Sequence, residues 1–130
     1  MLQCDFSYMI SPAMFERYVV PDLTACSEHL GAAFYHLDGP GELPHVDLLC
    51  DIPRLRGIQW ISGDGQAPPE KWPGLLAHIR ERGKLVQLFV SAQGALEIVR
   101  AIGGKGLLLT VTDSMGADQA RAFLAEIASA

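Results

Sequence analysis

The sequence predicts an α/β fold in which short parallel strands alternate with helices. Five apolar runs rich in Val, Ile, Leu and Phe recur along the chain, and segments with helical spacing separate them. The runs do not alternate apolar with polar residues, which is typical of strands buried on both faces, as in parallel sheets. Strand–helix alternation of this kind predicts right-handed crossovers between the strands. The runs lie at about residues 2–6, 32–37, 57–61, 85–90 and 106–111.

Each apolar run is followed by a segment that predicts a helix. The first of these begins at Ser11-Pro12, a helix cap followed by a first-turn proline, and Pro21 inside it should kink or split the helix. Its apolar positions are Phe15, Val19, Leu23, Cys26 and Leu30. The later helices are expected over 43–50, from Trp72 to a stop at Gly83, over 93–102, and across Ala120 to Ile127.

Five such units are compatible with two architectures. One is an open five-stranded parallel sheet, and the other is part of a (β/α)8 barrel, which takes about 250 residues when whole. The 130 residues show no linker or low-complexity tract, so a single domain over 1–130 is expected. In both architectures ligands bind at the carboxyl ends of the strands.

The composition argues against two classes of binding partner, nucleic acids and membranes. The net charge is −5 and the ten basic residues are scattered, which argues against nucleic acid and against an anionic membrane surface. No apolar run approaches the roughly 20 residues that a membrane span needs, and the N-terminus lacks a signal-peptide pattern. The three cysteines form no CxxC pair, so reduced thiols and a cytoplasmic location are expected.

The most informative strand end is His36-Leu37-Asp38, which is followed by a glycine-rich turn. Residues i and i+2 of a strand point to the same face, so the imidazole and the carboxylate should lie side by side. Such a pair can bind a divalent metal, act as a general acid–base couple, or hold a polar substrate. The alternative is ordinary turn chemistry, with Asp38 capping the turn.

Other polar residues follow the remaining strands and have structural alternatives too. Asp64 and Asp113 are also typical of turns and helix caps, and Trp60 is also typical of a core. His45 and Asp47 form a second His-x-Asp, but they diverge on a helix, which favours a solvated face. The further strand-end candidates are Asp5, Tyr8, Gln59, Trp60, Asp64, Thr112 and Asp113.

Four segments carry a family resemblance. They read "CDFSYMISPAMFERYVVPDL", "YHLDGPGELPHVDLLCDIPRLRGIQWISGDG", "KWPGLLAHIRERGK" and "KGLLLTVTD". In this order they resemble the C-terminal part of the uroporphyrinogen decarboxylase-like superfamily, which includes the cobalamin-dependent methyltransferases. The resemblance implies a (β/α)8 barrel of which this chain supplies roughly the last five units.

The resemblance also implies roles for the strand-end residues. His36 matches a zinc-binding histidine of the thiol-activating methyltransferases, and Asp38 stands where that family has a cysteine. Asp5, Tyr8 and Asp38 are the expected catalytic residues. A small-molecule substrate would bind Gln59, Trp60 and Asp113, zinc would bind His36 and Asp38, and the methyl donor would be a methyl-corrinoid on a partner protein.

Two alternatives stay open. One is a metal-free lyase of the decarboxylase type, in which Asp38 or Asp5 is the acid. The other is a non-catalytic half-barrel module, which would form a homodimer to cover its open strand edges.

Overall fold

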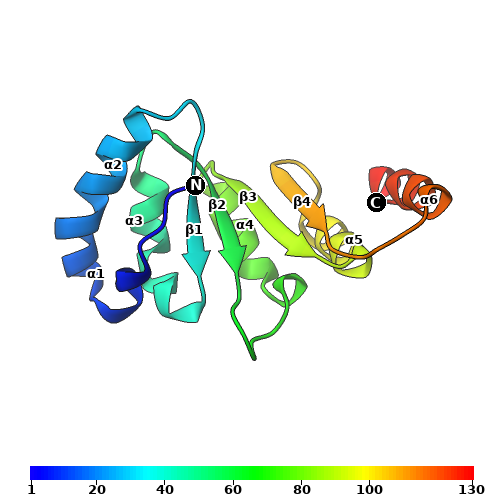
Figure 1. Ribbon diagram of the computed structural model, residues 1–130, viewed down its shortest axis with the longest axis horizontal. Helices are drawn as coiled ribbons and strands as arrows, with labels where there is room; N and C mark the ends of the chain where they lie inside the picture. Colours follow the sequence, from blue (N-terminus) through cyan, green and yellow to red (C-terminus); the bar gives the residue numbers. More distant parts are fainter.

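Four parallel strands alternate with helices in the computed structural model, which describes all residues 1–130 (Figure 1). The strands are β1 (Ala33–Asp38), β2 (Leu55–Ile61), β3 (Leu85–Val90) and β4 (Leu107–Val111). They form one open sheet in the order β1-β2-β3-β4, and every neighbouring pair is parallel. The predicted α/β fold with parallel strands is confirmed.

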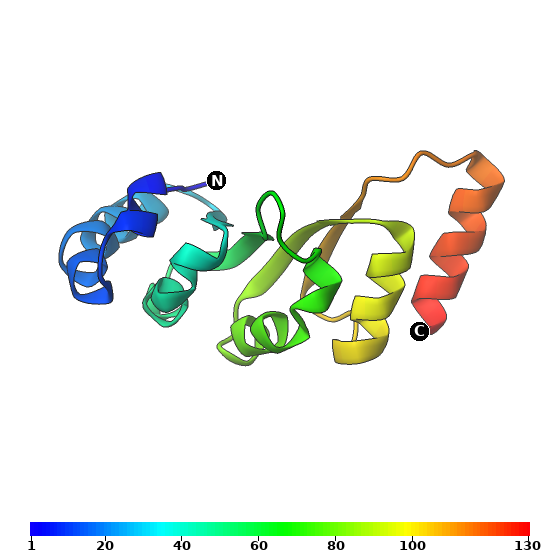
Figure 2. The same ribbon diagram turned by 90° about the horizontal axis from the view of Figure 1, so that it is seen from below.

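The helices that follow the strands cover one side of the sheet. Figure 2 shows α3, α4 and α5 on the same side, beneath the strands. None of the helices combines the length and the apolar composition that a membrane-spanning helix requires. The α-helices are α1 (Pro12–Met14), α2 (Val20–Glu28), α3 (Val46–Asp51), α4 (Pro73–Glu81), α5 (Ala92–Ile102) and α6 (Ala117–Ser129).

The first predicted strand, over residues 2–6, is wrong for most of its length. Only Leu2 pairs with the sheet, through an isolated parallel bridge to Tyr35. Residues Asp5–Met9 form a 3-10 helix instead. Ser7 explains the change, because its hydroxyl bonds the carbonyl oxygen of Cys4 at 2.5 Å and so favours a turn over an extended chain.

The first predicted helix is split, as expected from Pro21. A π-helical turn over Phe15–Val19 separates α1 from α2, and Pro21 lies in the first turn of α2. Proline has no N–H to donate and its ring crowds the preceding turn, so the wider turn before it relieves both problems. The helix therefore continues past Pro21 and still buries Phe15, Val19 and Leu23.

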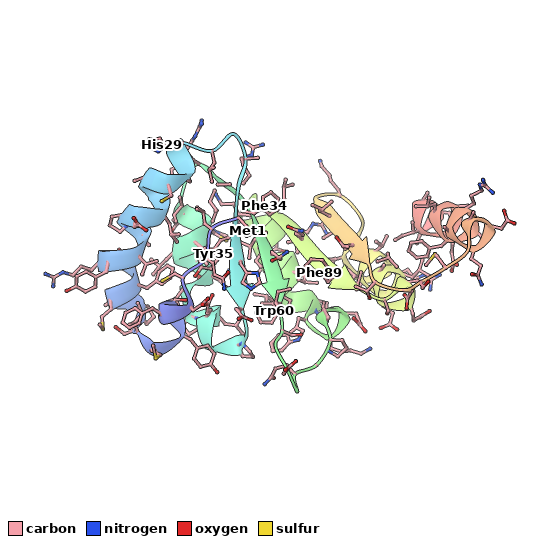
Figure 3. All side chains as sticks on the ribbon, viewed as in Figure 1. Met1, His29, Phe34, Tyr35, Trp60 and Phe89 are labelled. Carbon is pink, nitrogen blue, oxygen red and sulfur yellow. The ribbon has the colours of Figure 1, made fainter.

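The two faces of the sheet differ in their cover. The face toward the helices carries the core, whose strand residues are Ala33, Tyr35, Leu37, Ile58, Trp60, Val86, Leu88 and Val90. The opposite face has no helix on it. Phe34 and Phe89 belong to that face (Figure 3), and Leu108 on β4 is 53% exposed there.

Gly57 on the bare face fixes the packing of two strands. A Cβ at this position would lie 2.3 Å from the ring of Phe34 and 2.7 Å from the carbonyl oxygen of Leu85. We expect Gly57→Ala to lower the free energy of unfolding by about 1–3 kcal/mol, because the backbone must move to admit the methyl group. Gly74→Ala is the control, since nothing lies within 4 Å of a Cβ there. Urea denaturation that finds the two variants equally stable would contradict this packing.

Candidate functional site

A pocket of about 450 Å³ opens at the carboxyl ends of β1 and β2. Three segments line it: the N-terminal 3-10 helix, the turn after β1 and the loop after β2. Four of its residues are carboxylic acids and none is basic. The lining residues are Asp5, Tyr8, Asp38, Gly39, Pro40, Glu42, Ser62, Gly63, Asp64 and Gln66. Of the predicted site residues, the structure brings Asp5, Tyr8 and Asp38 together here.

Glycines shape this pocket. Gly39, directly after β1, has a φ of 84°, which only glycine adopts readily, and it turns the chain sharply beside Asp38. A Cβ at Gly41 would lie 2.1 Å from the ring of Tyr8. Because Gly41 has no side chain, the ring of Tyr8 can pack against the turn after β1. The Tyr8 side chain is nevertheless 60% exposed.

His36 lies on the bare face of β1, as the alternation of the strand predicts. Its Nδ1 is 2.5 Å from Oε1 of Gln59, the residue paired with it on β2. Because an amide oxygen only accepts, Nδ1 carries the proton and Nε2 is left with the lone pair. Gln59 therefore fixes the tautomer of His36 and is nearly buried beneath it.

The residues of this chain do not complete a zinc site by themselves. His36 and Asp38 would supply two donors, but no group of three or more His, Cys, Asp or Glu side chains is placed to hold one ion. Zinc in structural and catalytic sites takes at least three protein ligands. His36 and Asp38 alone are therefore too few donors to hold a zinc ion.

Four predicted site residues do not line the pocket: His36, Gln59, Trp60 and Asp113. Trp60 is fully buried on the helix side of the sheet, where its ring meets the edge of Trp72 at a centroid distance of 5.2 Å. Asp113 is exposed and accepts a hydrogen bond from the backbone N–H of Ala92 at the start of α5. The structural alternatives, core for Trp60 and helix cap for Asp113, describe these positions better than a shared substrate site.

A buried polar cluster beneath the pocket was not predicted from the sequence. Glu42 is 1% exposed, although it contributes to the pocket lining. Its Oε1 lies 2.6 Å from the hydroxyl of Ser7, and its Oε2 lies 3.4 Å from the hydroxyl of Tyr35 and 3.3 Å from the backbone nitrogen of Asp38. The cluster joins the 3-10 helix, β1 and the turn after it.

His45 belongs to the same buried layer, which corrects the expectation of a solvated face. Its ring stacks on Phe15 at 4.3 Å, and its Nε2 lies 2.9 Å from the carbonyl oxygen of Ser7. Because a carbonyl only accepts, Nε2 carries the proton. Asp47 is exposed as expected and pairs with His78 and Arg82.

Burial raises the pKa values of two acidic groups in the cluster, Glu42 and Tyr35. Desolvation raises the pKa of Glu42, and the negative charge of Asp38 acts the same way, which outweighs the hydrogen bonds that favour the ionised form. Desolvation also raises the pKa of Tyr35 above its ordinary value. Both groups therefore keep their protons to a higher pH than they would in water.

A second cavity, of about 630 Å³, lies at the opposite end of the sheet, before β3 and β4. Arg80, Lys84 and Lys105 line it. The first two already have structural partners: Arg80 donates to the carbonyl oxygens of Ile102 and Gly103, and buried Lys84 donates to two carbonyl oxygens. These cations satisfy carbonyl groups near the helix ends, which is a structural role.

Comparison with known proteins adds no family to this picture. No family model, no curated protein and no solved structure matches the chain.

Proposed function

We propose that this chain is part of a (β/α)8-barrel enzyme of the uroporphyrinogen decarboxylase-like superfamily, with an activity like that of the corrinoid-dependent methyltransferases. The observation that carries the proposal is the acidic pocket at the carboxyl ends of consecutive parallel strands. In barrels of this class the active site lies at that end.

The winding of the sheet supports a barrel over a doubly wound sheet. A doubly wound sheet has helices on both faces and a reversal in strand order. Here the order is consecutive, and α3, α4 and α5 lie on one side (Figure 2). The bare face, with Phe34, His36 and Gln59, would then point to the barrel interior, where side chains from several strands pack together.

The charge of the pocket favours a particular class of substrate. Four carboxylic acids and no cation suit a small molecule that is positively charged or donates hydrogen bonds, such as an amine or an alcohol. A metal-free lyase acting on a polycarboxylate is the alternative, but it would need cations to hold its substrate, and none line this pocket.

Asp38 is the catalytic residue that the geometry favours most. Its exposed carboxylate borders the pocket at the end of β1, where it can take a proton from a methyl acceptor. Tyr8 and Asp5 complete the same wall. Zinc binding by His36 and Asp38 stays a prediction. Metal analysis should then find zinc in the wild-type protein and less in His36→Ala, and a metal-free wild type would contradict it.

Demethylation of methylcobalamin tests the proposed function. The barrel-complete protein that contains this chain is mixed with methylcobalamin in the dark together with small amines, alcohols or thiols, and the absorbance of the corrinoid is followed. We expect a loss of methylcobalamin that requires both the chain and an acceptor. If no acceptor of these three classes gives a rate above the protein-free control, the methyltransferase proposal is wrong.

The bare sheet face favours a second candidate, the half-barrel module that dimerises. Leu85, Phe89 and Leu108 are each at least 41% exposed on that face, and β4 has an open edge. A second copy of the chain could cover the bare face and the open edge of β4. Light scattering should then find a dimer, and Leu108→Asp should convert it to a monomer with unchanged helix content. A wild-type monomer at every concentration would exclude this candidate.

A further inference from the structure

The cavity of about 630 Å³ before β3 and β4 gathers basic side chains in a chain whose net charge is −5. Four of the ten Lys and Arg residues form ion pairs with carboxylates. Three of the six that form none line this one cavity: Arg80, Lys84 and Lys105. Glu81 is the one carboxylic acid in the lining, and it pairs with none of them. The lining side chains therefore carry an excess of two positive charges.

The guanidinium group of Arg80 is held in place at one end and is free at the other. Arg80 lies in the last turn of α4, and its Nη1 donates to the carbonyl oxygens of Ile102 and Gly103 at the end of α5. A guanidinium has five N–H donors, and the three on Nε and Nη2 bond no atom of the protein. Nε and Nη2 together form a fork that matches two oxygens of a phosphate or a carboxylate. The contacts with α5 therefore orient this fork before any ligand binds.

The residues next to the fork leave room for a ligand. A Cβ at Gly106 would lie 3.7 Å from Nε of Arg80, so the glycine keeps side-chain atoms away from this nitrogen. The φ of Gly106 is 82°, which other residues rarely adopt, so the backbone itself favours glycine here. Lys105 directly precedes it and is exposed, so its ammonium can move toward a bound anion.

Lys84 adds a buried positive charge to the same lining. It is 9% exposed, and its Nζ lies 2.7 Å from the carbonyl oxygen of Ile52 and 2.8 Å from that of Leu55. An ammonium group has three N–H donors, so these two bonds leave one unused. Desolvation lowers the pKa of Lys84, which means that its surroundings do not fully compensate its charge. An anion in the cavity would compensate it.

We propose that this cavity is a second binding site, which takes the phosphate group of a small phosphate ester. The fork of Arg80 binds two phosphate oxygens, and Lys105 supplies a mobile counter-charge. A phosphate dianion balances the excess of two positive charges, whereas a single carboxylate balances half of it. The cavity has the volume of a site for a small organic molecule, and Ala77, Leu85 and Ala101 give it an apolar wall for the organic part.

The site is independent of the proposed function, because it lies at the opposite end of the sheet from the acidic pocket. A purely structural role for the cations is the alternative. α4 and α5 both end here, and the carbonyl groups at a helix C-terminus attract cations and repel anions. If the cations only neutralise these helix ends, no anion binds. The two explanations therefore make opposite predictions.

Titration of the chain with phenyl phosphate at constant ionic strength, followed by NMR, tests the site. We expect shifts of the backbone amide signals of Gly83, Lys105 and Gly106, which line the cavity. The side-chain Nε–H signal of Arg80 should shift with them and reports directly on the fork. Inorganic phosphate should shift the same signals with a weaker affinity, because it has no organic part. Equal affinities for the two probes would overturn the assignment to a phosphate ester.

Two variants separate the fork from the charge. Arg80→Lys keeps the charge and removes the fork, so we expect the Kd for phenyl phosphate to rise about 10-fold or more, the effect of losing a hydrogen bond to a charged group. Lys105→Gln changes an exposed side chain and should fold normally, and we expect the Kd to rise about 2- to 5-fold. Arg17→Gln is the control, because Arg17 is exposed on the π-helical turn, and it should leave the Kd unchanged.

Three results would overturn the inference. The absence of shifts at millimolar phenyl phosphate would mean that the cations only neutralise the helix ends. Equal losses of affinity in Lys105→Gln and Arg17→Gln would mean that binding depends on net charge and not on this cavity. A wild-type Kd in Arg80→Lys would mean that the fork does not hold the phosphate group. None of these results bears on the methylcobalamin assay, so the site and the proposed function can fail separately.

Discussion

Replacing Trp60 by alanine is expected to lower the free energy of unfolding by about 3–5 kcal/mol. Trp60 is 0% exposed, and it packs against the core on the helix side of β2 and against the ring of Trp72. Alanine would leave a large cavity that neighbouring strands cannot close, since their backbone pairing holds them in place. Urea denaturation followed by far-UV circular dichroism measures the change without relying on tryptophan fluorescence.

Trp60→Phe separates packing from polar contact. The indole nitrogen of Trp60 has no hydrogen-bond partner, so phenylalanine removes volume and no bond. We therefore expect a smaller loss of stability than for Trp60→Ala, and an unchanged affinity for any substrate. If Trp60→Phe were as stable as wild type but lost substrate binding, Trp60 would be a ligand contact and the assignment to the core would be wrong.

Replacing Asp38 by asparagine is expected to reduce the rate of methyl transfer by about 100-fold or more, the usual contribution of a general acid or base. Asparagine keeps the size and the backbone N–H that bonds Glu42, and it removes only the ability to take a proton. The rate of methylcobalamin demethylation at saturating acceptor, compared with wild type, measures the effect.

Asp118→Asn is the matched control for this experiment. Its carboxylate is almost fully exposed on α6 and pairs only with Arg121. We expect it to keep the wild-type rate. Equal rates for Asp38→Asn and wild type would show that Asp38 is not the base, whereas equal losses in both variants would point to a general effect of net charge.

The sequence predicted the strands well where burial decides them. β2 and β3 pack in the centre of the sheet, and their apolar runs place them to within two residues at each end. The segment Asp5–Met9 could not be predicted in the same way, because its conformation depends on Ser7. That serine bonds Glu42, which is 35 residues away in the chain.

The part of the candidate site that depends only on neighbouring residues in the sequence was predictable. The alternation of a strand is local, so the shared face of His36 and Asp38 followed from the sequence. The partners were not local: Gln59 reaches His36 through the β1–β2 register, and Phe15 buries His45 from another helix. Glu42 gave one weak signal, an acid within a glycine- and proline-rich turn, which is ordinarily a solvated residue.

Mapping a small cation onto the backbone by NMR tests most directly the claim that the pocket at the carboxyl ends is the ligand site. The chain is titrated with methylammonium, a cation that is small enough to enter the acidic pocket. We expect shifts of the amide signals of Gly39, Ser62 and Gly63, which line the pocket, and the loss of these shifts in Asp38→Asn. Shifts at Gly83, Lys105 and Gly106 around the cavity at the other end of the sheet, or no shifts at all, would contradict it.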